Sequence, residues 1–157
     1  MKNKNFGGMA ICEKLFNWIR SNLQNGKIIL EFGSGTGTIE LTKYYTVYSV
    51  EQDKEWIGFA QKSNYIYAPI KNGWYDSDIV FNNIPNNYDL ILIDGPKGHG
   101  NRGGIINHLN KLNTDVPIII DDITRPKDDE HAILIANKLK KAFKKIYSEK
   151  KGFMIIN

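Results

Sequence analysis

The sequence predicts an α/β fold, a doubly wound and mostly parallel sheet of seven strands that ends in an antiparallel hairpin. From residue 27 onward, short apolar runs alternate with segments of helical periodicity, which is the pattern of a parallel sheet covered by helices. The last two apolar runs, within residues 145–157, are joined by a tight Lys-Gly turn and predict the hairpin. A chain of 157 residues suits a single domain over 1–157, with residues 1–26 as a helical N-terminal extension.

The first elements follow from local spacing. Apolar residues recur at helical spacing in 9–23, and an Asn-Gly pair stops that helix. Residues 27–32 are a short β-branched run of the kind buried in a parallel sheet, and a glycine cluster and a short helix follow them. Residues 46–51 predict a second strand, and residues 53–62 predict a helix with Asp53 as its N-cap.

The remaining elements alternate in the same way. They are a third strand in 64–70, a fourth in 88–94, a helix in 103–112, a fifth strand in 116–122 and an amphipathic helix in 128–143. The fourth strand, YDLILID, is the clearest of all, and the two strands of the final hairpin bring the total to seven.

The composition is that of an ordinary globular protein, with 41% hydrophobic and 24% charged residues. No apolar stretch approaches the roughly 20 residues that a membrane crossing requires, and the first residues lack an apolar signal core. Cys12 is the only cysteine, so an internal disulfide is excluded and a structural zinc site is not expected. We therefore expect a cytoplasmic protein without a membrane partner.

The positive charge is concentrated near the end of the chain. Residues 138–151 contain seven lysines and one acidic residue, although the whole chain carries a net charge of only +4. Such a segment is most often the solvated face of a last helix, and the alternative is a contact surface for nucleic acid or another polyanion.

Three glycines, Gly33, Gly35 and Gly37, follow the first predicted strand within five positions. In doubly wound sheets ligands bind beyond the carboxyl ends of the strands, and glycine allows close approach of the backbone to a ligand. The spacing G-x-G-x-G differs from the G-x-G-x-x-G of dinucleotide folds, because Thr38 stands where those folds have their last glycine. A P-loop is excluded because no Gly-Lys-Ser/Thr follows.

Glu31 precedes the glycines, and Glu51 closes the second strand. The pair of motifs resembles the first two motifs of class I S-adenosylmethionine-dependent methyltransferases, which have a Rossmann-like fold. The resemblance implies that Glu31 lies near the methionine group of S-adenosylmethionine and that Glu51 binds both ribose hydroxyls. The cofactor-binding residues that it implies in these two motifs are Glu31, Gly33, Ser34, Gly35, Gly37, Thr38, Glu51 and Gln52.

Two aromatic residues are candidates for contact with the adenine ring. In the fold that the chain resembles, the segment after the third strand borders the adenine, so Trp74 or Tyr75 would stack on it. The alternative is that these aromatic residues anchor the loop on the core. Trp56 is expected to be a core residue.

Acidic residues end the fourth and fifth strands. Asp94 ends the fourth, and Asp121 and Asp122 end the fifth, so neighbouring strands would bring three carboxylates together at the cleft. Such a cluster suits Mg²⁺ or another hard divalent ion, which would acidify and orient an acceptor hydroxyl. Asp94 also completes the expected cofactor site. Lys97 would then take the proton if its pKa is depressed, and His99 is the alternative base.

The Asp94, Lys97 and Asp121 pattern resembles the metal-dependent, catechol-type O-methyltransferases, although Asp122 stands where that family has Asn. The loop IDGPKGHGNRGG and the later DDITRP also resemble the polysaccharide O-methyltransferases of the glucuronoxylan type. In that case Lys97, His99 and Arg102 would grip an acidic sugar, and no metal need be present.

The resulting hypothesis is an S-adenosylmethionine-dependent O-methyltransferase that acts on a glycan or another small hydroxylated acceptor. One alternative is an RNA methyltransferase that uses the lysine-rich segment as its contact surface. Another is a non-catalytic subunit that binds the cofactor beside a partner. The Asp94-Gly-Pro-Lys97 sequence lacks the aromatic platform of amino-methylating DNA enzymes. The oligomeric state is not determined by the sequence.

Overall fold

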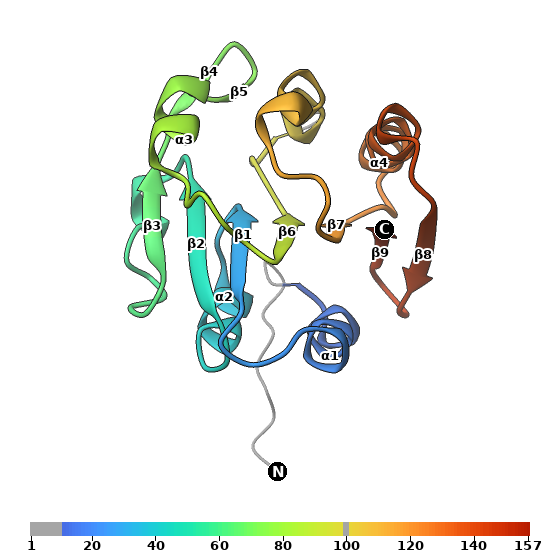
Figure 1. The fold of residues 1–157 in the computed structure, drawn as a ribbon, viewed down its shortest axis with the longest axis horizontal. Coiled ribbons are helices and arrows are strands. Elements are labelled where there is room, and N and C mark those ends of the chain that lie inside the picture. Colours follow the sequence, from blue (N-terminus) through green and yellow to red (C-terminus); the bar gives the residue numbers. More distant parts are fainter. Residues whose placement is uncertain (1–10, 99–100) are drawn as a thin grey trace.

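The computed structural model describes residues 11–98 and 101–157, and its centre is a seven-stranded sheet in the order β3-β2-β1-β6-β7-β9-β8 (Figure 1). All pairs from β3 to β7 are parallel, whereas β9 is antiparallel to both of its neighbours. The strands are β1 (Ile28–Phe32), β2 (Thr46–Glu51), β3 (Asn64–Tyr67), β6 (Leu90–Ile93), β7 (Ile118–Ile120), β8 (Phe143–Tyr147) and β9 (Gly152–Ile156). The predicted seven-stranded sheet with a terminal hairpin is confirmed.

Helices cover both faces of this sheet. One hydrophobic cluster contains Leu30 and Phe32 of β1 and packs against the helical segments that follow β5, β6 and β7. The other contains Ile29 and packs against α1 and α2. Alternate residues of β1 therefore enter different cores, which explains why the predicted strands are almost wholly apolar. The helices are α1 (Glu13–Asn22), α2 (Thr36–Leu41), α3 (Ser77–Asn83) and α4 (Pro126–Leu139), with 3₁₀ segments η1 (Lys54–Trp56) and η2 (Asn101–Lys111).

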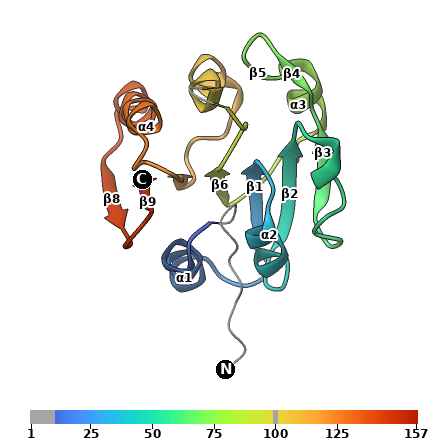
Figure 2. The same ribbon diagram turned by 180° about the vertical axis from the view of Figure 1, so that it is seen from behind.

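Seen from behind, the sheet has the same order reversed, and α4 lies beside the β8–β9 end in both views (Figure 2). An ion pair of 2.7 Å links Lys145 of β8 to Asp129 of α4, and Ala132, Ile135 and Ala136 of α4 pack into the core of the sheet. Among the described residues, no helix combines the length and the apolar character that crossing a membrane requires.

Several predicted boundaries were wrong. The helix predicted over 53–62 is only the 3₁₀ turn η1, although Asp53 does cap it by accepting a hydrogen bond from the amide of Glu55 at 3.0 Å. The chain leaves this turn at Gly58, whose φ is +81°. The predicted helix over 103–112 is the 3₁₀ segment η2, which begins two residues earlier.

The third strand and the last helix are also shorter than predicted. β3 ends at Tyr67, and a small hairpin of β4 (Ile70–Lys71) and β5 (Trp74–Tyr75) follows it. The last helix ends at Leu139, because Lys140 adopts a left-handed conformation with φ of +54°. The final turn spans residues 148–151 rather than the Lys-Gly pair, and Gly152 already belongs to β9.

The N-terminal prediction is tested only in part. α1 spans Glu13–Asn22, inside the helix predicted over 9–23, and its buried residues Leu15, Phe16 and Ile19 pack on the sheet. Residues 1–10 lie outside the described part of the chain.

Gly33 marks the closest approach between the tips of β1 and β6. Its φ is +89°, and a Cβ atom there would lie 2.8 Å from the carbonyl carbon and oxygen of Asp94. The first glycine of the cluster is therefore required by the protein's own backbone, which brings the loops after β1 and β6 into contact.

The variant Gly33→Ala tests this contact against Gly26→Ala, a glycine of φ +84° whose added Cβ would meet no described atom within 4 Å. Both substitutions force alanine into a left-handed conformation, which costs about 1–2 kcal/mol. Only Gly33→Ala adds a clash with backbone, which costs a further 1–3 kcal/mol or so. Urea unfolding should show the larger loss for Gly33→Ala, and equal losses would contradict the close approach.

Candidate functional site

A cavity of about 340 Å³ lies at the carboxyl ends of β1, β2, β6 and β7. It is at the point where the strand order reverses, because the chain runs from β1 outward to β3 and then returns to β6 on the other side of β1. Open α/β sheets bind ligands at such a point. The cavity is lined by Gly33, Ser34, Glu51, Gln52, Asp53, Trp56, Asp94, Gly95, Pro96, Lys97, Gly98, Arg102, Asp122, Thr124, Arg125, Lys150 and Lys151.

Glu51 joins the loops that follow β1 and β2. One carboxylate oxygen accepts a hydrogen bond from the amide of Ser34 at 2.8 Å, and the other accepts one from the amide of Asp53 at 2.9 Å. Burial raises the pKa of Glu51, although these hydrogen bonds oppose the shift. The predicted residues Gly33, Ser34, Glu51 and Gln52 all line the cavity.

Glu31 lies outside the cavity lining, and its expected proximity to the methionine group of the cofactor stays a prediction. Glu31 is buried beneath the glycine loop, on the same face of the sheet as α2. Its carboxylate accepts hydrogen bonds from the hydroxyls of Thr38, at 2.9 and 3.0 Å, and of Ser49, at 2.6 Å. Thr38 in turn accepts a hydrogen bond from the amide of Gly35 at 3.1 Å, so Glu31 anchors the loop from below.

Gly35, Gly37 and Thr38 also lie outside the cavity lining. A Cβ atom on Gly37 would come within 2.7 Å of the Ile11 side chain, so this glycine lets α2 pack closely against the segment that leads into α1. Part of the dense glycine pattern is therefore explained by packing within the protein.

The structure supports the alternative for Trp74 and Tyr75, that they anchor their loop on the core, and contradicts the expectation for Trp56. Trp74 and Tyr75 are 2% and 1% exposed, pack against Phe32 and are absent from the cavity lining, so they offer no free ring face to a ligand there. Trp56, expected in the core, is only half-buried and lines the cavity.

Three carboxylates meet at the tips of β6 and β7, as predicted. Oxygen atoms of Asp94, Asp121 and Asp122 lie within 4.8 Å of one another. Burial, and then the neighbouring Asp121, raises the pKa of Asp94 well above its usual range. Burial, and then Asp122, raises the pKa of Asp121 to about 6. Asp122 is also partly buried, but Arg102, Lys151 and Arg125 outweigh that effect and lower its pKa.

Arg102 lies inside this acidic cluster. Its guanidinium donates to the carboxylate of Asp122 at 2.9 Å and to the backbone carbonyls of Asp121 and Asp94 at 2.9 and 3.0 Å. A longer contact of 3.3 Å reaches the carboxylate of Asp94. The expected grip of Arg102 on a substrate is disfavoured in this arrangement, because its side chain is only 8% exposed and both terminal nitrogens already donate to protein oxygens.

The cluster does not fit a resident divalent ion as it stands. An ion held by Asp94 and Asp122 would bind the carboxylates that already contact the Arg102 guanidinium, and the two positive groups would repel each other without intervening water. Lys151 adds a further positive charge at 3.5 Å from Asp122 and 3.8 Å from Asp121.

The two candidate bases are only partly described. Lys97 is exposed and lines the cavity next to Asp94. His99 lies outside the described residues.

Sequence reasoning missed the contribution of Lys150, Lys151 and Arg125 to the cavity. Pairing of Ile120 in β7 with Met154 in β9 is antiparallel, so the turn before β9 lies at the carboxyl end of β7. The lysine-rich composition was visible in the sequence, but only the strand order indicates that two of its lysines reach the cleft.

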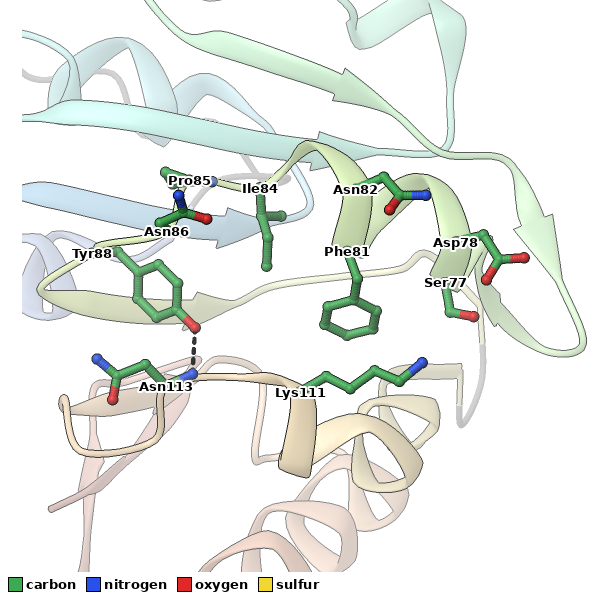
Figure 3. A pocket seen from close by; sticks show the side chains of 10 residues that line it. All are labelled: Ser77, Asp78, Phe81, Asn82, Ile84, Pro85, Asn86, Tyr88, Lys111 and Asn113. Atoms are coloured by element: carbon green, nitrogen blue, oxygen red, sulfur yellow. Dashed lines mark hydrogen bonds between the residues drawn. The ribbon is translucent and has the colours of Figure 1, made fainter.

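A second cavity, of about 400 Å³, lies between α3 and the end of η2 (Figure 3). Its wall includes Phe81, whose ring faces the Lys111 ammonium at 5.2 Å from the ring centre, and Tyr88, whose hydroxyl accepts a hydrogen bond from the amide of Asn113. None of the predicted site residues lines it. The strand-end cavity is therefore the candidate site.

Solved structures share this architecture. Magnesium protoporphyrin IX methyltransferase from Synechocystis PCC 6803, with bound S-adenosylmethionine, is 13% identical and has a TM-score of 0.63 over 92% of this chain and 77% of that one. Fibrillarin from Aeropyrum pernix, with natively bound S-adenosylmethionine, is 11% identical, with a TM-score of 0.65 over 92% and 74%. A Staphylococcus aureus protein provisionally assigned as a caffeoyl-CoA O-methyltransferase is 17% identical, with a TM-score of 0.64 over 92% and 81%.

These likenesses show the fold, which is the Rossmann-like fold of class I methyltransferases. No protein-family model matches the chain, and no curated protein matches it in sequence. The narrower resemblances to the catechol and glucuronoxylan types stay predictions.

The buried Glu31 gives a testable pH dependence. Burial raises its pKa from 4.5 to about 7 in the folded protein, so folding takes up a proton between these values. The contribution of Glu31 to the free energy of unfolding should therefore fall as the pH rises through this window, by up to about 3 kcal/mol. The free energy of unfolding, measured with denaturant at pH 5 and at pH 8, should differ less between the two pH values for Glu31→Gln than for the unaltered protein.

The exposed Glu55, changed to Gln, is the matched control and should leave the pH dependence as it is. A Glu31→Gln protein with the full pH dependence of the parent would contradict the assignment of this titration to Glu31.

Proposed function

We propose that this protein is an S-adenosylmethionine-dependent methyltransferase that transfers the methyl group to an oxygen atom of a sugar or another small hydroxylated acceptor. The observation that supports it best is the placement of Glu51 beside the glycine loop, in a cavity at the switch point of this fold. An acid at this position suits the ribose diol of a nucleoside cofactor.

The β1–β2 side of the cavity would hold the cofactor. Each oxygen of Glu51 accepts one amide hydrogen bond and keeps lone pairs for a ribose hydroxyl. Gln52 and Trp56 line the same wall, and the Trp56 ring is the aromatic surface that the adenine could stack on in place of Trp74 or Tyr75. Glu31 would act indirectly, by holding the glycine loop in place through Thr38.

The opposite side of the cavity suits an acceptor with negative charge. Lys97, Arg125, Lys150 and Lys151 line it, and they come from three separate segments of the chain. Arg125 is already paired with Asp122 and Asp128, at 2.6 and 2.8 Å. Lys97 and Lys150 are both exposed, and Lys150 is the cation that would meet a carboxylate or acidic sugar if Lys97 serves as the base.

The proposed reaction is an in-line displacement. The acceptor oxygen forms a bond to the methyl carbon as the carbon–sulfur bond breaks, and the sulfonium becomes a neutral thioether. A hydroxyl acceptor also loses its proton, for which Lys97 is the proposed base and His99 the alternative. The protein mainly contributes positioning of the two reactants.

The structural neighbours leave the acceptor class open. By their names, these neighbours methylate different acceptors. One is a methyltransferase of magnesium protoporphyrin IX, one is a provisional caffeoyl-CoA O-methyltransferase, and one is a complex that methylates a translation termination factor. The name of the second supports oxygen as the atom methylated. The third works as a complex of two proteins, so a partner subunit is conceivable for this chain as well.

An RNA acceptor is less favoured. In the lysine-rich segment, Lys138 and Lys141 donate to backbone carbonyls of Ile106 and Thr114, and Lys145 pairs with Asp129. These lysines do not form a single free surface for phosphates, and Lys150 and Lys151 line the cleft.

Cofactor binding is tested by calorimetry with S-adenosylhomocysteine. We expect binding by the unaltered protein and at least about tenfold weaker binding by Glu51→Gln, because hydrogen bonds to a charged group contribute about 1.5–3 kcal/mol each. Glu55→Gln, on the same segment but outside the cavity lining, is the control and should bind normally. Absence of binding by the unaltered protein at millimolar ligand would refute the proposed function.

Catalysis is tested by release of S-adenosylhomocysteine in the presence of pooled sugar acids, simple sugars and catechols. We expect Lys97→Ala to lower kcat by about 100-fold or more, the range of general base catalysis, with cofactor affinity unchanged. Lys62→Ala, an exposed lysine outside the cavity lining, should keep full activity. Full activity in both variants would exclude Lys97 as the base of the reaction.

A further inference from the structure

Arg102 combines features that set it apart from the other cations of the cleft. Its side chain is 8% exposed, whereas those of Arg125 and Lys151 are 47% and 24% exposed. It is at the start of η2, and its guanidinium reaches across to the tips of two neighbouring strands. A buried guanidinium requires paired acceptors, because an unpaired buried charge is strongly destabilising.

The acceptors of Arg102 are those that a hard cation would use. Two are backbone carbonyls, of Asp94 and Asp121, and two are carboxylates, of Asp94 and Asp122. Backbone and carboxylate oxygens are also the usual ligands of Ca²⁺ and Mg²⁺ in proteins. One planar group with five donors can serve several of these oxygens at once, which an ammonium group does less well.

We propose that Arg102 is the built-in cation of this cleft: its guanidinium takes the position of a divalent ion among Asp94, Asp121 and Asp122, and the site needs no metal. Arg102 is then a positioning residue. It ties the tip of β6 to the tip of β7 by direct hydrogen bonds to their final carbonyls.

This link has a consequence for the cofactor side of the cleft. The backbone of Asp94 that Arg102 holds is the backbone that Gly33 approaches most closely. The guanidinium therefore helps to fix the segment that separates the glycine loop from the acceptor side. The inference concerns the cation of the cluster and does not depend on the methyl acceptor or on cofactor binding.

The test is a titration of the full chain with Mn²⁺ alone, monitored by the loss of the free Mn²⁺ signal in electron paramagnetic resonance. We expect that the unaltered protein does not bind one Mn²⁺ per chain when free Mn²⁺ is at about 100 μM. Arg102→Met removes the guanidinium and keeps an unbranched side chain. This variant should bind one Mn²⁺ per chain, at least about tenfold more tightly than the unaltered protein does.

Arg125→Met is the matched control. Arg125 also pairs with Asp122, at 2.6 Å, but it is exposed and, within the described part of the chain, makes no hydrogen bond or ion pair with Asp94 or Asp121. Its removal should therefore leave Mn²⁺ binding as weak as in the parent. Circular dichroism establishes that each variant is folded.

Two results would overturn the proposal. One is that the unaltered protein takes up one Mn²⁺ per chain and that the substitution Asp122→Asn abolishes this uptake. The other is a folded Arg102→Met protein that takes up no Mn²⁺, since the position would then not be a cation site. If Arg102→Met does not fold, the titration of the unaltered protein and its Asp122→Asn variant decides the question alone.

Discussion

The approach of Gly33 to the backbone of Asp94 is the contact on which the rest of the cleft depends. It brings the loops after β1 and β6 together at the switch point, so that Glu51 stands on one side of the contact and the acidic cluster on the other. A side chain at Gly33 would separate these two loops, because its neighbours are main-chain atoms that cannot rotate away. The shape of the cavity is therefore determined by backbone packing before any ligand is considered.

Buried charge around this contact is compensated in two different ways. Glu31 is surrounded by hydroxyl groups, and burial raises its pKa to about 7, so near neutral pH it can carry a proton. The three aspartates at the tips of β6 and β7 instead face the positive charges of Arg102 and Lys151. A network of this kind is stable only while its partners remain in place, because the loss of one leaves an uncompensated buried charge. The first arrangement supports the glycine loop, and the second supports the opposite wall.

The two walls suggest how the proposed chemistry would be divided. Acidic Glu51 suits the hydroxyl groups of a nucleoside cofactor, whereas Lys150 suits an anionic acceptor and Lys97 is the proposed base. The fold itself does not choose the acceptor, because the same architecture carries small-molecule and protein methylation among its structural neighbours. The chemistry of the side chains that line the cleft is therefore the main guide to the substrate.

The sequence by itself determined the alternation of strands and helices, the bounds of β2, and the positions of Glu51, Asp94 and Asp121 at strand ends, because periodicity and strand-end residues are local signals. It also predicted that the acidic residues would meet if their strands were neighbours. It could not show that Glu31 lies beneath the glycine loop, that Trp56 rather than Trp74 or Tyr75 lines the cavity, or that Arg102 compensates the aspartates. Those features were decided by the order of strands in the sheet and by the lengths of turns, which bring residues far apart in the chain into contact.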